Sequence, residues 1–316
     1  MAYSAGDTIL DDEYNTFVNN SSNPYGYNHF AGPGSGVYGL NQSTISTVSA
    51  GGTINASSWN SLFTGLDNIS NHTNVAITAS SVSAGDTVAI RAALVSDLAN
   101  LAAAVAGGST SATALTDRAA GTSTNGNTWN TTSTIERSIT FANNNTMRAY
   151  FNAGGTIKIN PGTSGSVSGS KDTVFQQLEA AVGTLEFKAH ATTRSGSGET
   201  QTTFNSGTGF HDLSTGYSTL LKLTSNNSGY TSDTLTISAK LNAAVSSATV
   251  ITIKSVASDP AADTTYTSGN LSGVPSNPNE APAMSLALTA KEPTAAQGLA
   301  SAIQFSSNAQ VSNSAS

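Results

Sequence analysis

The segment that decides the fold class is residues 133–159, which read STIERSITFANNNTMRAYFNAGGTIKI. Every second residue is predicted to face the core, first over residues 135–141 and again over residues 147–151, and the residues between them are polar. Alternation with a period of two is typical of a strand that buries one face. Runs of Asn and Gly at 143–145 and 152–155 separate the alternating stretches, and these residue types favour turns. We predict an antiparallel meander whose strands carry Ile135, Arg137, Ile139, Phe141, Met147, Ala149, Phe151, Ile157 and Ile159.

The same pattern continues in short runs towards the C-terminus. One helix is predicted over residues 172–182, with Asp172 as its cap and Gly183 at its end. Further strands are predicted around residues 185–188, 220–223, 234–240, 250–256 and 284–288. Short strands separated by polar turns, with a single helix, predict an α+β, β-dominated fold in which residues 133–292 form an antiparallel β-sandwich-like domain.

Two polar segments flank this domain. Residues 107–132 are rich in Ser, Thr, Gly and Asn and are predicted to be a linker or extended arm. Residues 293–316 are rich in Ala, Ser, Gln and Asn, with Ile303 and Phe305 as isolated apolar anchors. Because this extended tail has no core of its own, we expect it to lie along a neighbour.

A short element of the form SAG(D/G)T(I/V) occurs three times within residues 1–106, beginning at Ser4, Ser49 and Ser83. An aromatic–Asn pair lies ten residues after the first Ser in the first two copies, as Tyr14-Asn15 and Trp59-Asn60. Helical spacing of apolar residues follows each copy. Because short helices are marginal alone, we predict that these stripes pack on one another or on neighbouring chains. The predicted assembly and packing residues are Tyr14, Phe17, Trp59, Leu62, Phe63, Leu66, Leu94 and Leu98.

Residues 24–39 lie between the first two copies and combine turn residues with aromatics. Tyr25, Tyr27, Phe30 and Tyr38 are candidates for a contact surface. The competing interpretation, which we favour, is that these rings pack back onto the helices.

The composition excludes several classes of protein. Charged residues make up 10% of the chain, with 12 Lys and Arg against 19 Asp and Glu, and there is no Cys. So few cations cannot neutralise a run of phosphates, so we expect no nucleic-acid partner. The missing Cys excludes disulfides, thiolate nucleophiles and zinc knuckles. No apolar run approaches the roughly 18–20 residues of a membrane span, so we expect no membrane insertion, and the first residues lack the pattern of a secretory signal.

The search for catalytic or metal-binding motifs predicts none. The four His residues show no metal-ligand spacing, and the adjacent pair His211-Asp212 is interpreted as part of a structural loop. The acidic run 11–13 suits the start of a helix better than a cation site. A calcium site at the loop residues Asp259 and Asp263 is disfavoured in the same way. We therefore predict a protein without enzymatic activity or cofactor.

Three stretches of the sequence resemble structural proteins of tailed bacteriophages, especially marine cyanophages. The first is the repeat, with its Gly-Asp-Thr-Ile turn followed by a short helix carrying Trp59-Asn60. The second is residues 148–157, RAYFNAGGTI, and the third is residues 209–217, GFHDLSTGY. Gly52 replaces Asp in the second copy, and Ala93-Leu94 replaces the aromatic–Asn pair in the third. The resemblance implies a virion component of a tail, fibre or other appendage, and it brings no catalytic residues.

The main hypothesis is therefore a phage virion structural protein, made in the host cytoplasm, whose partners are copies of itself and other virion proteins. Closed homo-oligomers are usual in such assemblies. The alternatives are an adhesin that binds a glycan of the host cell surface, with aromatic rings stacking on sugars, and a capsid decoration protein. A polysaccharide depolymerase is a further, less favoured alternative.

Overall fold

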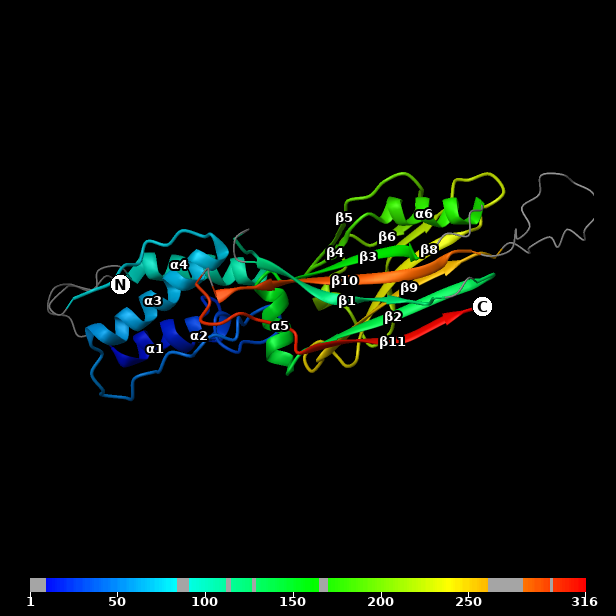
Figure 1. The fold of residues 1–316 in the computed structure, drawn as a ribbon. Coiled ribbons are helices and arrows are strands. Elements are labelled where there is room, and N and C mark those ends of the chain that lie inside the picture. The colour runs from blue at the N-terminus through cyan, green and yellow to red at the C-terminus, as the bar shows by residue number, and fades with distance from the viewer. Residues whose placement is uncertain are drawn as a thin grey trace, which may run out of the picture. The chain divides into compact units, whose positions relative to one another are not determined.

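The computed structural model describes residues 10–83, 91–111, 115–126, 129–164, 170–260, 281–295 and 298–316. It confirms the α+β, β-dominated fold, with two antiparallel sheets of five and six strands (Figure 1). The chain forms two compact units. The helical unit takes residues 1–116, 143–155 and 292–304, and the β unit takes residues 117–142, 156–291 and 305–316.

The helical unit is built on amphipathic helices. They are α1 (Asp11–Asn19), α2 (Tyr27–Phe30), α3 (Ala56–Thr73), α4 (Arg91–Ala106) and α5 (Asn144–Asn152). Helix α3 begins where the Asn55 side chain accepts a hydrogen bond from the Ser58 N–H, and ends at Asn74, whose φ of 58° is left-handed. Its buried stripe packs against α4. The turns of the first and third repeats, 4–9 and 84–88, lie outside the described residues.

The β unit contains both sheets and helix α6 (Ser170–Val182). The five-stranded sheet has the order β1 (Leu115–Thr124), β10 (Ala283–Pro293), β3 (Thr156–Ser164), β4 (Leu185–Phe187) and β5 (Thr192–Arg194). The six-stranded sheet has the order β11 (Ser307–Ala315), β2 (Thr132–Thr140), β9 (Val250–Ser258), β8 (Thr234–Leu241), β7 (Ser218–Thr224) and β6 (Thr200–Phe204). Alternate residues such as Ile139 and its cross-strand partner Ile251 are fully buried, as expected for strands with one inward face.

Arg137 joins the two sheets from the middle of β2. Its guanidinium donates to the Ser123 hydroxyl at 2.5 Å and to the Ala120 carbonyl at 2.9 Å, both on β1, and to the Asn308 side chain on β11 at 2.7 Å. Arg137 is only 5% exposed, and burial lowers its pKa. The approach requires Gly121, whose φ is 85°, because a Cβ there would lie 2.5 Å from the Arg137 Nη2.

The structure corrects the prediction of a strand at Met147, Ala149 and Phe151. These residues lie in helix α5, where every residue from Met147 to Asn152 is buried. The Asn143 side chain caps the helix by accepting a hydrogen bond from the Thr146 N–H at 2.9 Å. Arg148 then anchors α5 by donating to the carbonyls of Pro33 and Gly34.

Both polar segments contain strands that the sequence does not predict. The expected arm of residues 107–132 contains β1, and the expected tail contains β11. The tail follows its own chain, because β11 pairs with β2 from Ser307↔Thr140 to Ala315↔Ser133. Asp172 lies in the first turn of α6, not at its cap, because the helix begins two residues earlier.

Helix α6 also holds a carboxyl that should respond to pH. Burial raises the pKa of Glu179 to about 8, although hydrogen bonds with Thr163 act in the opposite direction. A carboxyl with a raised pKa in the folded state contributes stability that is present below its unfolded pKa of 4.5 and is lost as the pH rises through 8. The variant Glu179→Gln should therefore be more stable than the native chain at pH 9, by on the order of 3 kcal/mol.

The measurement is urea unfolding of the β unit between pH 5 and 9, followed by Trp129 fluorescence in a Trp59→Phe background. The control is Glu199→Gln, which neutralises a half-exposed carboxyl of the same unit. Parallel pH profiles for the native chain and Glu179→Gln would refute this expectation.

Candidate functional site

Three Asn side chains of the helical unit hold extended main chain that pairs with no strand of the described residues. Asn15 donates to the Val48 carbonyl and accepts from the Val48 N–H, both at 2.8 Å. Asn28 makes the same pair of bonds with Ile45, at 2.9 and 2.8 Å. Asn60 makes them with Val82, also at 2.9 and 2.8 Å. Each amide thus satisfies both polar groups of one residue, as a neighbouring strand would.

This arrangement explains the aromatic–Asn pair of the repeat. The ring enters the core, where Tyr14 and Trp59 meet edge to face with centroids 5.3 Å apart. The following Asn binds the Val that directly precedes the next SAG element. The third unit has Leu94 in the Asn position, and Leu94 is fully buried. Its Asp97 instead accepts from the N–H groups of Thr78 and Ala79.

Loss of one such amide should measurably weaken the helical unit. Asn60→Ala is expected to lower its free energy of unfolding by about 2 kcal/mol, because two hydrogen bonds are lost. Asn60→Asp, which retains the shape but loses the donor, should be nearly as damaging. The measurement is urea unfolding followed by Trp59 fluorescence in a Trp129→Phe background. Asn71→Ala changes an exposed Asn on the same helix and should cost less than about 0.5 kcal/mol. Equal effects at Asn60 and Asn71 would rule out this role.

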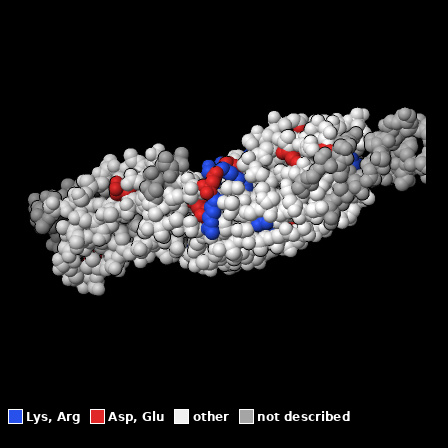
Figure 2. Space-filling model, viewed as in Figure 1, with Lys and Arg blue, Asp and Glu red and all other residues white. Residues whose placement is uncertain are grey.

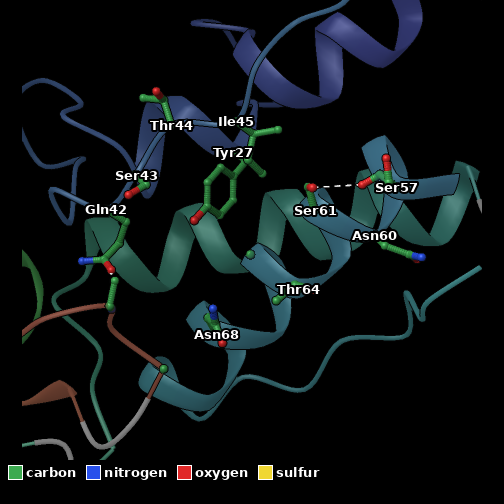
Figure 3. A pocket seen from close by; sticks show the side chains of 13 residues that line it. Tyr27, Gln42, Ser43, Thr44, Ile45, Ser57, Asn60, Ser61, Thr64 and Asn68 are labelled. Atoms are coloured by element: carbon green, nitrogen blue, oxygen red, sulfur yellow. Dashed lines mark hydrogen bonds between the residues drawn. The ribbon is translucent and has the colours of Figure 1, made fainter. Parts of the chain in front are cut away.

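A groove of about 530 Å³ lies on the helical unit (Figure 3). One wall is the extended segment 42–45, and the other is the polar face of α3, which carries Ser57, Ser61, Thr64 and Asn68. These α3 positions are spaced by four, three and four residues and so share one side of the helix. Tyr27 lies between the two walls, and Gly298 and Ala300 complete the lining.

Among the described residues that line the groove, none carries a charge. Its lining consists of hydroxyl and amide groups together with Ile45, Gly65, Gly298 and Ala300. The ring of Tyr27 packs against Gly65, where a Cβ would lie 2.7 Å from the ring. Burial raises the pKa of Tyr27 to about 12, so this hydroxyl stays protonated and can donate a hydrogen bond at neutral pH.

All eight predicted assembly and packing residues lie in the core of the helical unit. Each is at most 5% exposed, so these side chains pack within this chain and are closed to a neighbouring copy. Trp59 is central to them, since it contacts Tyr14, Phe17 and Phe63 at centroid distances of 5.3, 6.1 and 5.8 Å.

The structure divides the predicted aromatic contact surface. Tyr27 and Phe30 are buried, at 5% and 0% exposure, whereas Tyr25 and Tyr38 are half-buried. Tyr25 stacks on His29 at 4.4 Å, and Tyr38 contacts both rings at 4.6 and 4.9 Å. Part of the surface of each of these three rings is therefore buried against the other two. Burial also lowers the pKa of His29.

The groups considered for catalysis or metal binding have local structural partners. Asp212 accepts from the Gly209 N–H at 2.9 Å, and His211 stacks on His190 at 4.8 Å. The acidic residues 11–13 occupy the first turn of α1. Within the part of the chain that the structure describes, no group of three or more His, Asp or Glu side chains is placed to hold a metal ion. Asp263 lies outside that part.

Comparison of the chain with protein-family models, with curated proteins and with solved structures found no match. Among the described helices, none is long and apolar enough to cross a bilayer. The candidate site is therefore interpreted from its own geometry. Sequence reasoning missed the groove residues Ser43, Thr44, Thr64 and Asn68, and the one available signal was the polar stripe of residues 57–68 opposite the apolar stripe of the same helix.

Proposed function

We propose that the chain is a non-catalytic structural subunit of a tailed-bacteriophage virion, in its tail, a fibre or another appendage, and that it assembles as a homo-oligomer. The observation that carries the proposal is the role of the repeated element. The residues that resemble virion proteins are architectural, since Tyr14 and Trp59 build the core while Asn15 and Asn60 hold the main chain. None of these positions supplies a reactive group.

The surface supports the same proposal. The face drawn in Figure 2 has charged side chains only in small groups, in keeping with the 10% charged residues of the chain. Edge strand β11 is exposed at all nine positions and contains neither a charged residue nor a proline. Charged residues and prolines are the usual features that prevent a free edge strand from pairing with another chain. Neutral surfaces of this kind can meet identical copies without like-charge repulsion.

Sedimentation equilibrium of the purified chain tests the assembly. The proposal expects a mass that is a small multiple of 31.9 kDa, unchanged by moderate salt because few charges are involved. A monomer at all accessible concentrations would contradict the homo-oligomer.

A further inference from the structure

Some polar side chains of the groove on the helical unit are hydrogen-bonded within the chain, and others are free to bind a ligand. The Gln42 side chain donates to the Leu40 carbonyl and accepts from the Ala300 N–H. Asn60 donates one bond to and accepts one from Val82, and the Ser61 hydroxyl donates to the Ser57 carbonyl. These bonds fix the walls without filling the space between them.

The Ser57 hydroxyl donates to the Asn55 side chain, and the remaining polar side chains of the lining have no hydrogen-bond partner in the described part of the chain. They are the side chains of Ser43, Thr44, Thr64 and Asn68 and the hydroxyl of Tyr27. They come from three segments, namely α2, the extended segment and α3, and Figure 3 shows them around the same space. Together they offer hydroxyls, which both donate and accept, and an amide with a donor and an acceptor end.

This chemistry discriminates among ligands. The described lining of the groove contains no Lys or Arg, so a phosphate, sulfate or sugar carboxylate would lose its hydration without gaining a charged partner there. A purely apolar ligand would leave the hydroxyls and amide unsatisfied. A neutral molecule with many hydroxyls can both donate hydrogen bonds to these groups and accept hydrogen bonds from them. The volume of about 530 Å³ falls within the usual range for small-molecule sites.

We propose that this groove binds a neutral oligosaccharide, with Thr64 and Asn68 of α3 and the Tyr27 hydroxyl as its main hydrogen-bonding groups. A sugar would not stack on an exposed aromatic ring at this site. The ring of Tyr27 is buried against Gly65, so only its hydroxyl is available to the ligand. The assignment is independent of the assembly state, and a virion subunit with this groove would gain a contact to a neutral glycan.

The test uses the full chain with neutral di- and trisaccharides of glucose, galactose and N-acetylglucosamine at up to about 10 mM. Binding is detected by saturation-transfer difference NMR and measured by calorimetry. Asn68→Ala and Thr64→Ala should each weaken binding about 3- to 10-fold through one lost hydrogen bond. Thr64→Trp should abolish it by filling the groove. All three changes are at exposed helix positions, and circular dichroism confirms that each variant folds.

The matched control is Asn71→Ala, an exposed Asn on the same helix outside the groove lining. It should bind as the native chain does. The proposal is overturned if no neutral sugar binds at these concentrations, or if only sialylated or sulfated sugars added to the panel bind. It is also overturned if Thr64→Trp retains full binding. These outcomes leave the sedimentation result untouched, so failure of this inference is distinct from failure of the proposed function.

Discussion

Replacing Trp59 with alanine is expected to lower the free energy of unfolding of the helical unit by about 3–5 kcal/mol, the usual cost of removing a large buried aromatic side chain. Trp59 is 3% exposed and contacts Tyr14, Phe17 and Phe63, so its loss opens a cavity where α1 meets α3. The measurement is thermal and urea unfolding followed by helix circular dichroism, since the substitution removes the tryptophan of this unit.

Two further variants make this expectation specific. Trp59→Phe keeps most of the packing and removes an indole N–H that makes no hydrogen bond within the described residues, so it should cost much less than alanine. Asp67→Ala, at an exposed position of the same helix, should change stability by less than about 0.5 kcal/mol. A loss below 1 kcal/mol for Trp59→Ala would show that the helical unit does not depend on this aromatic cluster.

Replacing Arg137 with methionine is expected to destabilise the β unit by about 3 kcal/mol. The substitution keeps an unbranched apolar stem and removes donors to Ala120, Ser123 and Asn308. Hydrogen bonds made by charged groups are worth about 1.5–3 kcal/mol each, and part of that sum is offset because methionine avoids the cost of burying a guanidinium. The Ala120 carbonyl and the Ser123 hydroxyl left behind stay buried, so those two bonds are not regained from water, whereas Asn308 is exposed. Urea unfolding followed by Trp129 fluorescence, in a Trp59→Phe background, measures the change.

Lys158→Met is the matched control for a cation outside the core. Its ammonium lies 2.9 Å from an Asp117 carboxylate oxygen, but the two side chains are 22% and 52% exposed, so the pair should contribute less than about 1 kcal/mol. Gly121→Ala should reproduce part of the Arg137 effect, because the added Cβ would collide with the guanidinium. Equal stability of Arg137→Met and Lys158→Met would refute a role for Arg137 in joining the sheets.

Elements with a clear buried face could be predicted from the sequence. Ile135 and Ile139 alternate over the length of β2, and the apolar stripe that starts at Trp59 repeats over several turns of α3. Each signal extends far enough to distinguish a period of 2 from one of 3.6. The fold class therefore follows from local pattern alone.

Helix α5 shows where a local pattern is too short to decide. Met147, Ala149 and Phe151 alternate as in a strand. The i, i+3, i+4 spacing of Met147, Tyr150 and Phe151 fits one face of a helix just as well. The choice is made by the Asn143 cap and by the contacts of Arg148 with the loop at Pro33 and Gly34. Those contacts join residues more than one hundred positions apart and leave no local trace.

Strands without a buried face leave no periodic signal at all. Every residue of β11 is exposed, and the strand is held by its ladder with β2, whose residues are far away in the chain. The groove has the same character, because segment 42–45, helix α3 and residues 298–300 are brought together only by the fold. Its individual Ser, Thr and Asn residues are unremarkable in a sequence so rich in these types.

The proposal that the chain is a structural subunit of a virion is tested most directly by quantitative mass spectrometry of purified phage particles from a culture that produces the chain. The claim expects peptides of both units, residues 10–111 and 129–260, at several copies per particle and retained after salt and nuclease washes. It is contradicted if the chain is abundant in the infected-cell lysate but absent from the purified particles.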